Sequence, residues 1–336
     1  MGKSFRTEIE LADSFYELDY HSKILLLGSC FTQNIGQRLS NHKFDCLINP
    51  FGISYNPVSI SKTLHRIASN RLVDTKYILH REGAYFHYGY HSSISSSEPA
   101  DLAAQIREIH ETTSSTIQAG RLCFISLGTS IVHRLLSDGT VVSNCHKMPQ
   151  SLFEQVFLTY QDTLHSLEMM VSSLMKLNDK IQVVFTVSPI RHTRYGLISN
   201  QRSKATLIAA VHAIIENSSN CHYFPSYEIM QDDLRDYRFY TKDLIHPNET
   251  AIDYIWDHLI NGTCTDETKS IIKKISQINA NLRHRPSRPD IASRKSFLVK
   301  TLSEIEEIKK ASPVITFEKE TIQINEELRL FPADPK

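Results

Sequence analysis

The sequence lacks the features that mark several classes of protein. Its 336 residues include 37 basic and 37 acidic side chains, so no net charge attracts nucleic acid or an anionic membrane surface. No apolar run approaches the length of a membrane span, and the N-terminal residues contain no apolar core of a signal peptide. We therefore expect a soluble, cytoplasmic protein that binds neither nucleic acid nor membranes.

Disulfide scaffolds and metal centres are not indicated either. The six cysteines are spread singly, without a CxxC pair, which is typical of free thiols in a reducing compartment. Histidines gather within residues 76–98, but their spacing matches no recognisable set of metal ligands. We expect neither a metal nor a cofactor.

What the chain does contain is a regular alternation of short apolar runs and amphipathic segments. The runs predict strands at residues 23–28, 44–48, 122–127, 181–187 and 222–227. Helices are predicted between them, including a long one over 151–177. This order predicts a flavodoxin-like three-layer α/β/α sandwich around a parallel five-stranded sheet. Ligands bind such a sheet at the carboxyl ends of its strands.

Two segments depart from this alternation. Residues 76–98 predict an inserted hairpin rich in tyrosine and histidine, which forms either an aromatic wall for a sugar-like substrate or a flap over the core. From about residue 263 the composition becomes charged and helical, with a Pro/Arg linker at 283–290. We expect one domain over 1–262 and a helical C-terminal extension over 263–336. The extension packs on the body or on a partner, which would include a second copy of the chain.

The first predicted strand ends at a place suited to a nucleophile. Ser29 and Cys30 follow Gly28 and precede a helix, whose N-terminal N–H groups lower the pKa of a thiol and stabilise an oxyanion. This stretch alone is more typical of a plain strand-to-helix corner with a small buried cysteine. Asp243 and His246 add a second feature, because a carboxylate three residues away can orient an imidazole as a general base. Nucleophile and oriented base are the minimum set for acyl transfer.

Several motifs resemble a known family. The DxxHP sequence at 243–247, together with a GxS-type turn after the first strand, resembles the SGNH (GDSL-type) hydrolase superfamily. Within it, the chain resembles the GSCFA family between about residues 23 and 259. Six motifs in order carry that resemblance: GSCF at 28–31, NPFG at 49–52, LGTS at 127–130, NCHK at 144–147, VSPIRH at 187–192 and NQRSKATL at 200–207. It implies the SGNH hydrolase fold.

The resemblance also implies roles for single residues. In the superfamily the nucleophile is the third residue of the Gly-x-Ser turn, which is Cys30 in this chain, whereas a local shift of one residue would make it Ser29. His246 and Asp243 complete the triad.

The resemblance further implies an oxyanion hole. Gly52 resembles the glycine whose backbone N–H group contributes to the hole. The superfamily's GxND asparagine is missing from the turn at 128–130, and Asn144 could replace it if the hairpin at 131–143 folds back over the crevice. A hole that lacks one donor costs a factor of about 10²–10³ in rate.

Basic residues gather in the loops expected at the same end of the sheet. We assign substrate binding to Lys147, Arg191, His192 and Arg202, with Arg194 and Lys204 close by in sequence. Arginine binds carboxylate or phosphate in a bidentate manner, which predicts an anionic substrate. The alternative is that these cations pair with the acidic residues of 228–236, and it is slightly favoured.

Together these features predict an esterase or deacylase that acts through an acyl-enzyme on an O-acylated carbohydrate, either anionic or neutral, or on a related small ester. An O-acyltransferase is the close variant, because a sugar hydroxyl can replace water as acceptor. A different class of function is a non-catalytic ligand-binding module on a degenerate SGNH scaffold, which is supported by the irregular GSC turn and the missing asparagine. A third alternative is an interaction protein that works through its helical tail.

Overall fold

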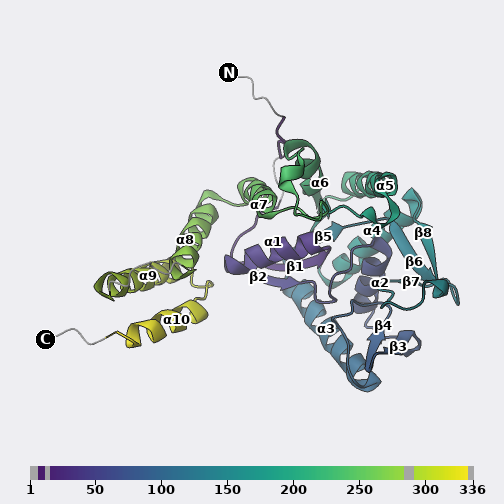
Figure 1. Ribbon diagram of the computed structural model, residues 1–336, viewed down its shortest axis with the longest axis horizontal. Coiled ribbons are helices and arrows are strands. Elements are labelled where there is room, and N and C mark those ends of the chain that lie inside the picture. Colours follow the sequence, from purple (N-terminus) through teal and green to yellow (C-terminus); the bar gives the residue numbers. More distant parts are fainter. Residues whose placement is uncertain (1–6, 12–15, 284–290, 332–336) are drawn as a thin grey trace.

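The computed structural model describes residues 7–11, 16–283 and 291–331. Five parallel strands form its central sheet (Figure 1). Their order across the sheet is β2 (Asp45–Ile48), β1 (Lys23–Gly28), β5 (Leu122–Leu127), β9 (Gln182–Val187) and β10 (Cys221–Tyr223). The chain therefore runs 2-1-3-4-5 across the sheet, and the strand order reverses between β1 and β5. The predicted fold class is confirmed.

Helices cover both faces of this sheet, as the alternation along β1 shows. Ile24 and Leu26 point into one apolar cluster, which also contains residues of α1 (Cys30–Asn41) and α7 (Glu249–Thr263). Leu25 and Leu27 point into a second cluster on the opposite face. The helices of that second cluster are α2 (Pro57–Ala68), α3 (Pro99–Ala119), α4 (Tyr160–Leu177) and α5 (Leu197–Glu216). A strand buried on both faces reads as a continuous apolar run, which is why the sequence predicted it.

The long helix predicted over 151–177 is wrong in its first part. A 3-10 turn (Gln150–Leu152) leads into a strand, β8 (Phe153–Phe157), and α4 begins only at Tyr160. Thr159 and Asp162 form a capping box that starts α4. β8 pairs with β6 (Ile131–Leu135), which also pairs with β7 (Val141–Val142), so a small antiparallel sheet stands beside the main one.

The inserted hairpin is confirmed as β3 (Ile78–Arg81) and β4 (Ala84–His87), joined by Glu82 and Gly83 with positive φ angles. The fifth strand is shorter than predicted, because Pro225 follows it and has no N–H group to donate. Short helical turns connect the remaining elements: η1 (Thr75–Tyr77), η3 (Thr193–Tyr195), α6 (Ser226–Glu228), η4 (Ile229–Asp233) and η5 (Tyr237–Phe239).

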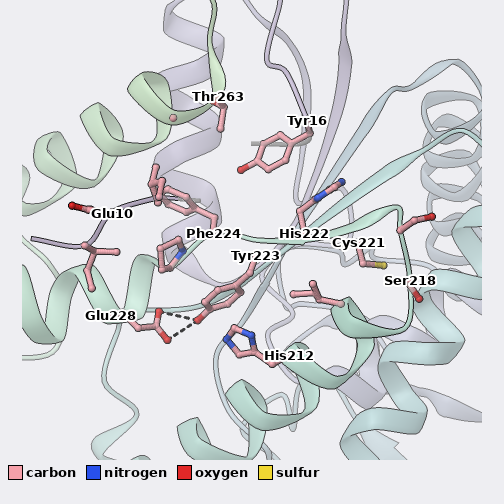
Figure 2. Close-up of a pocket in the computed structure, with 16 residues that line it drawn as sticks. Glu10, Tyr16, His212, Ser218, Cys221, His222, Tyr223, Phe224, Glu228 and Thr263 are labelled. Carbon is pink, nitrogen blue, oxygen red and sulfur yellow. Dashed lines mark hydrogen bonds between the residues drawn. The ribbon is translucent and has the colours of Figure 1, made fainter. Parts of the chain in front are cut away.

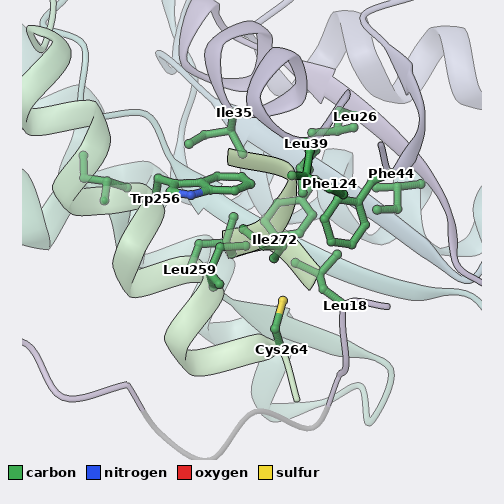
Figure 3. Packing of buried hydrophobic residues seen from close by; sticks show 14 of the residues in the cluster. Leu18, Leu26, Ile35, Leu39, Phe44, Phe124, Trp256, Leu259, Cys264 and Ile272 are labelled. Atoms are coloured by element: carbon green, nitrogen blue, oxygen red, sulfur yellow. The ribbon is translucent and has the colours of Figure 1, made fainter. Parts of the chain in front are cut away.

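The C-terminal extension forms an arm of helices, α8 (Asp266–Arg283), α9 (Ile291–Ala311) and α10 (Glu318–Arg329), of which α10 was not predicted (Figure 1). The predicted linker at 283–290 lies outside the described residues beyond Arg283. Ile272 of α8 packs with Trp256 of α7 in the same apolar cluster as β1 (Figure 3). Lys43 pairs with Glu320 of α10 at 2.6 Å. The arm therefore packs on the body. Among the described helices, none is both long and apolar enough to cross a bilayer.

Candidate active site

Ser29 closes the turn between β1 and α1 as a structural cap. Its Oγ accepts a hydrogen bond from the Phe31 N–H group at 3.2 Å, which satisfies one of the free donors at the start of α1. The same Oγ bonds to Ser126 Oγ at 2.9 Å and Ser188 Oγ at 3.1 Å, at the ends of β5 and β9. Ser29 is only 5% exposed. Its hydroxyl therefore lies among the strand ends and ties three of them together.

Gly28 makes this corner possible. Its φ is +131°, and a Cβ atom there would lie 2.1 Å from the carbonyl oxygen of Ser126. Its N–H group donates to the side chain of Asn49 at 2.9 Å. Only glycine allows this approach of β1 to β5, which brings the next two residues to the crevice at the carboxyl ends of the strands.

Cys30, the first residue of α1, has a different environment from Ser29. It is half-buried and lines a cavity of about 890 Å³ together with Tyr55, Asn144 and Cys145. Burial raises the pKa of the Cys30 thiol, and its own backbone N–H group offsets this in part. At neutral pH the thiol is therefore protonated and needs a base to become a nucleophile.

Asp243 and His246 form the pair that the sequence predicts. The Asp243 carboxylate accepts hydrogen bonds from the N–H groups of Ile245 at 2.8 Å and His246 at 3.1 Å, and from His246 Nδ1 at 2.7 Å. The Thr241 hydroxyl and these donors hold the pKa of Asp243 well below its usual range. An ionised carboxylate at Nδ1 keeps the proton there. Nε2 of His246 has no hydrogen-bond partner in the described part of the chain, so it can accept a proton.

Hydrogen bonds connect the loop of His246 to the turn of Cys30 through the loop after β9. Ser188 begins that loop and is bonded to Ser29, and three residues later the Arg191 N–H group donates to the Ile245 carbonyl at 3.2 Å. The three loops thus meet at the carboxyl ends of the parallel strands. Within the described residues, however, His246 neither lines the cavity nor forms a hydrogen bond with Cys30.

The backbone donor expected at Gly52 is already in use. Gly52 has a φ of +70°, and its N–H group donates to the Asn49 carbonyl at 2.8 Å. A Cβ atom there would lie 2.3 Å from Cβ of His91, so close packing also requires glycine. The next residue, Ile53, lines the cavity, and its N–H group has no hydrogen-bond partner among the described residues. The free backbone donor in this loop is therefore one residue further along than expected.

Asn144 follows β7 in the wall of the cavity. It lines the cavity with Cys30, because the hairpin of β6 and β7 leads the chain back over the crevice. Its side-chain oxygen accepts a hydrogen bond from the His146 N–H group at 2.7 Å. The side-chain NH₂ group has no partner in the described structure and can act as a donor.

The basic residues separate into different environments. Of the four predicted to bind substrate, Lys147 lines the cavity. Arg191 instead stacks on the Tyr240 ring at 4.0 Å, and Arg202 lies over the Phe157 ring at 4.6 Å. Among the described residues, none of these three cations forms an ion pair with the acidic residues of 228–236, which was the alternative expectation.

His192 is half-buried, and Lys204 is fully buried rather than presented to solvent. The His192 ring packs edge-on against Tyr55 at 5.1 Å, and burial, with a contribution from Lys204 and Arg194, lowers its pKa to about 4. His192 is therefore neutral at pH 7. Lys204 is 1% exposed, and its Nζ donates to the Ser188 carbonyl at 2.6 Å.

Sequence reasoning missed most of the cavity wall. His133 on β6 bonds to the Tyr195 hydroxyl at 2.8 Å, and Phe153 and Gln155 come from β8. The β-prone sequence FEQVF at 153–157 was the signal that could have revealed this wall. No group of three potential metal ligands occurs within the described residues.

A second cavity, of about 720 Å³, lies at the β10 edge of the sheet (Figure 2). Tyr223 donates its hydroxyl proton to the carboxylate of Glu228, with both oxygens 2.8 Å away. Apolar residues from the N-terminal segment and from β10 dominate its lining. None of the predicted catalytic residues lines this second cavity.

The chain was compared with known sequences, solved structures and protein families. No curated protein sequence matches it. Among solved structures, a carbohydrate esterase family 3 protein from Talaromyces cellulolyticus covers 76% of this chain and 99% of its own at 10% identity, with a TM-score of 0.34, too low for any inference about activity. A model of the GSCFA domain protein C-terminal domain matches residues 275–330. The GSCFA family model matches residues 23–259, more than half of the chain. The chain therefore belongs to the GSCFA family.

Proposed function

We propose that this protein is an esterase or deacylase of the SGNH type, with Cys30 as the nucleophile that carries the acyl group. The observation that supports this most strongly is the contrast at the GSC turn. Cys30 lines a cavity large enough for a sugar-sized ester, whereas the hydroxyl of Ser29 is occupied by three hydrogen bonds inside the protein. The Asp243 and His246 pair on a neighbouring loop supplies the base.

The proposed reaction has two steps that share one base. The Cys30 thiol attacks the acyl carbonyl while Nε2 of His246 takes its proton, and the tetrahedral intermediate then expels the alcohol, which receives that proton. Water, deprotonated by His246, attacks the thioester, and the carboxylic acid leaves as the thiol is restored. The developing oxyanion is stabilised by the N–H groups of Cys30 and Ile53, by the Asn144 amide and by the helix dipole of α1.

This mechanism requires a movement of the His246 loop, because the imidazole is not hydrogen-bonded to Cys30 in the structure. Substrate binding often tightens such contacts. The same missing contact favours the second candidate, a ligand-binding protein on a degenerate hydrolase scaffold. An O-acyltransferase differs only in the second step, where a sugar hydroxyl replaces water.

Hydrolysis of p-nitrophenyl acetate separates these candidates. The wild-type protein should release p-nitrophenol, and Cys30→Ala and His246→Ala should each lower kcat/KM by at least about 10³-fold, because nucleophile and base act as a unit. Circular dichroism and thermal melting should show that both variants remain folded.

Cys145→Ser is the matched control, since it removes the other thiol of the same cavity. It should lose far less activity than Cys30→Ala. A wild-type protein without esterase activity would favour the binding protein, and activity retained in both Cys30→Ala and His246→Ala would contradict the proposed mechanism.

A further inference from the structure

The charges that face the Cys30 cavity are of one sign. Lys147 and Arg194 both line it, and so do two imidazoles, those of His91 and His133. Within the described chain, no aspartate or glutamate is among the lining residues.

The two cations are also uncompensated. Neither Lys147 nor Arg194 forms an ion pair with any described residue, whereas Arg134 beside the same wall pairs with Glu154 at 2.7 Å. Arg194 lies 5.6 Å from the Tyr195 ring, which contacts its cation but does not neutralise it. The cavity therefore carries a positive charge that an anion would balance.

Both cations are held by anchored loops. The backbone of His146 and Lys147 is left-handed, with φ angles of 49° and 55°, and Arg81 of the hairpin donates to the His146 carbonyl at 2.6 Å. Arg194 belongs to η3, which is fixed by the bond between the Tyr195 hydroxyl and His133. The backbone that carries the two cations is thus anchored, although both side chains are exposed, so a ligand would not have to order these loops.

The imidazoles of the cavity add no charge of their own at neutral pH. Burial lowers the pKa of His91, and burial together with Arg194 lowers that of His133. They act as neutral hydrogen-bonding groups beside the amides of Gln150 and Gln155. Amides and aromatic rings in one cavity suit a hydroxylated ring.

We infer that the Cys30 cavity selects an anionic, hydroxylated ester, an O-acylated sugar acid or sugar phosphate, whose negative group binds to Lys147 and Arg194. The inference builds on the proposed esterase, but recognition of the anion does not depend on turnover. It keeps Lys147, which the sequence suggested for this role, and assigns Arg194 in place of Arg191 and Arg202, which lie over aromatic rings and do not line the cavity. Guanidinium and ammonium groups both bind carboxylate and phosphate.

Protection of Cys30 from alkylation tests the inference without any catalysis. Iodoacetamide is neutral, so its reaction with Cys30 can be followed by mass spectrometry at constant ionic strength in the presence of glucuronate, glucose 6-phosphate or glucose. The two anions should slow alkylation in a saturable manner by at least about tenfold, and glucose should not. A difference between the two anions would show whether the site prefers carboxylate or phosphate.

Two variants assign the effect to the cavity. Arg194→Gln and Lys147→Gln should each weaken protection by glucuronate or glucose 6-phosphate at least about tenfold, while alkylation without ligand changes little. Lys180→Gln is the control, because it removes one positive charge in the exposed loop before β9, at the amino-terminal ends of the strands and away from the cavity. It should keep full protection.

Equal protection by glucose, or protection that survives in the Arg194→Gln, Lys147→Gln double variant, would overturn the inference. These outcomes are independent of the esterase itself. A protein that binds the anions but hydrolyses no ester would retain the inference and contradict the proposed function.

Discussion

At the scale of single residues, the burial of the Lys204 ammonium group next to the turn of Ser29 and Cys30 is energetically costly. This group is almost fully buried and donates to the carbonyl of Ser188, the residue whose hydroxyl is bonded to Ser29. Burial lowers the pKa of Lys204 to about 7, and Glu228 offsets this in part. Lys204 thus joins α5 to the corner that positions Cys30, and a buried amine makes that corner sensitive to pH.

Because of Lys204, stability should rise with pH in the neutral to alkaline range. Between about pH 7 and about pH 10, an unfolded lysine is protonated while the folded Lys204 has lost its proton, so the unfolded state binds more protons. The free energy of unfolding then rises by at most about 1.4 kcal/mol per pH unit from this group. Lys204→Met should remove that slope, since it has no amine to titrate.

Urea denaturation of wild type and Lys204→Met measures this difference between about pH 6.5 and about pH 9.5, which spans the range from just below the folded pKa of Lys204, about 7, to well above it. The difference between the two curves should be flat at the acid end, where Lys204 is protonated in both states, and should rise toward the alkaline end. Parallel curves would show that Lys204 does not titrate in this range.

At the scale of elements, locally encoded features were predictable. Ser29, Asn56 and Asn248 cap α1, α2 and α7, and a residue of this type directly before a helix is a local signal of its start. Asp243 and His246 also form a local pair, three residues apart, so their hydrogen bond could be expected from spacing alone. Buried parallel strands stand out because both faces are apolar.

Elements that depend on distant partners were not predictable in the same way. β8 forms a strand because β6, about twenty residues earlier, offers its edge, and that pairing overrides the helical pattern of the segment. The cavity wall built from this sheet, and with it His133, was therefore missed. The neighbours of Lys147 and Arg194 likewise depend on how separate loops pack, so spacing could not distinguish them from Arg191 and Arg202.

At the scale of the whole molecule, the helical arm and the body share one apolar cluster. Ile272 of α8 belongs to it together with Trp256, the single tryptophan (Figure 3). Ile305 of α9 belongs to the same cluster, and Trp256 stacks on His42 at 5.0 Å. Trp256 therefore reports on the junction between arm and body. A shared core implies that the two parts unfold together.

Ile305→Ala tests this coupling from the far side of the junction. Ile305 is fully buried, so its truncation should lower the free energy of unfolding by about 2–5 kcal/mol. If arm and body unfold as one unit, the midpoints from Trp256 fluorescence and far-ultraviolet circular dichroism should shift together. A shift in circular dichroism alone, with an unchanged fluorescence midpoint, would show that the arm unfolds separately.

The central claim, that Cys30 is the nucleophile on an SGNH-type scaffold, is tested most directly by locating the acyl group. Wild-type protein is mixed with p-nitrophenyl acetate, quenched in acid within the first turnovers, digested and mapped by tandem mass spectrometry. We predict an acetyl group on Cys30, released by neutral hydroxylamine as expected for a thioester, and much less of it in His246→Ala. An acetyl group on Ser29, stable to hydroxylamine, or no acetyl group on either residue of the turn would contradict the account.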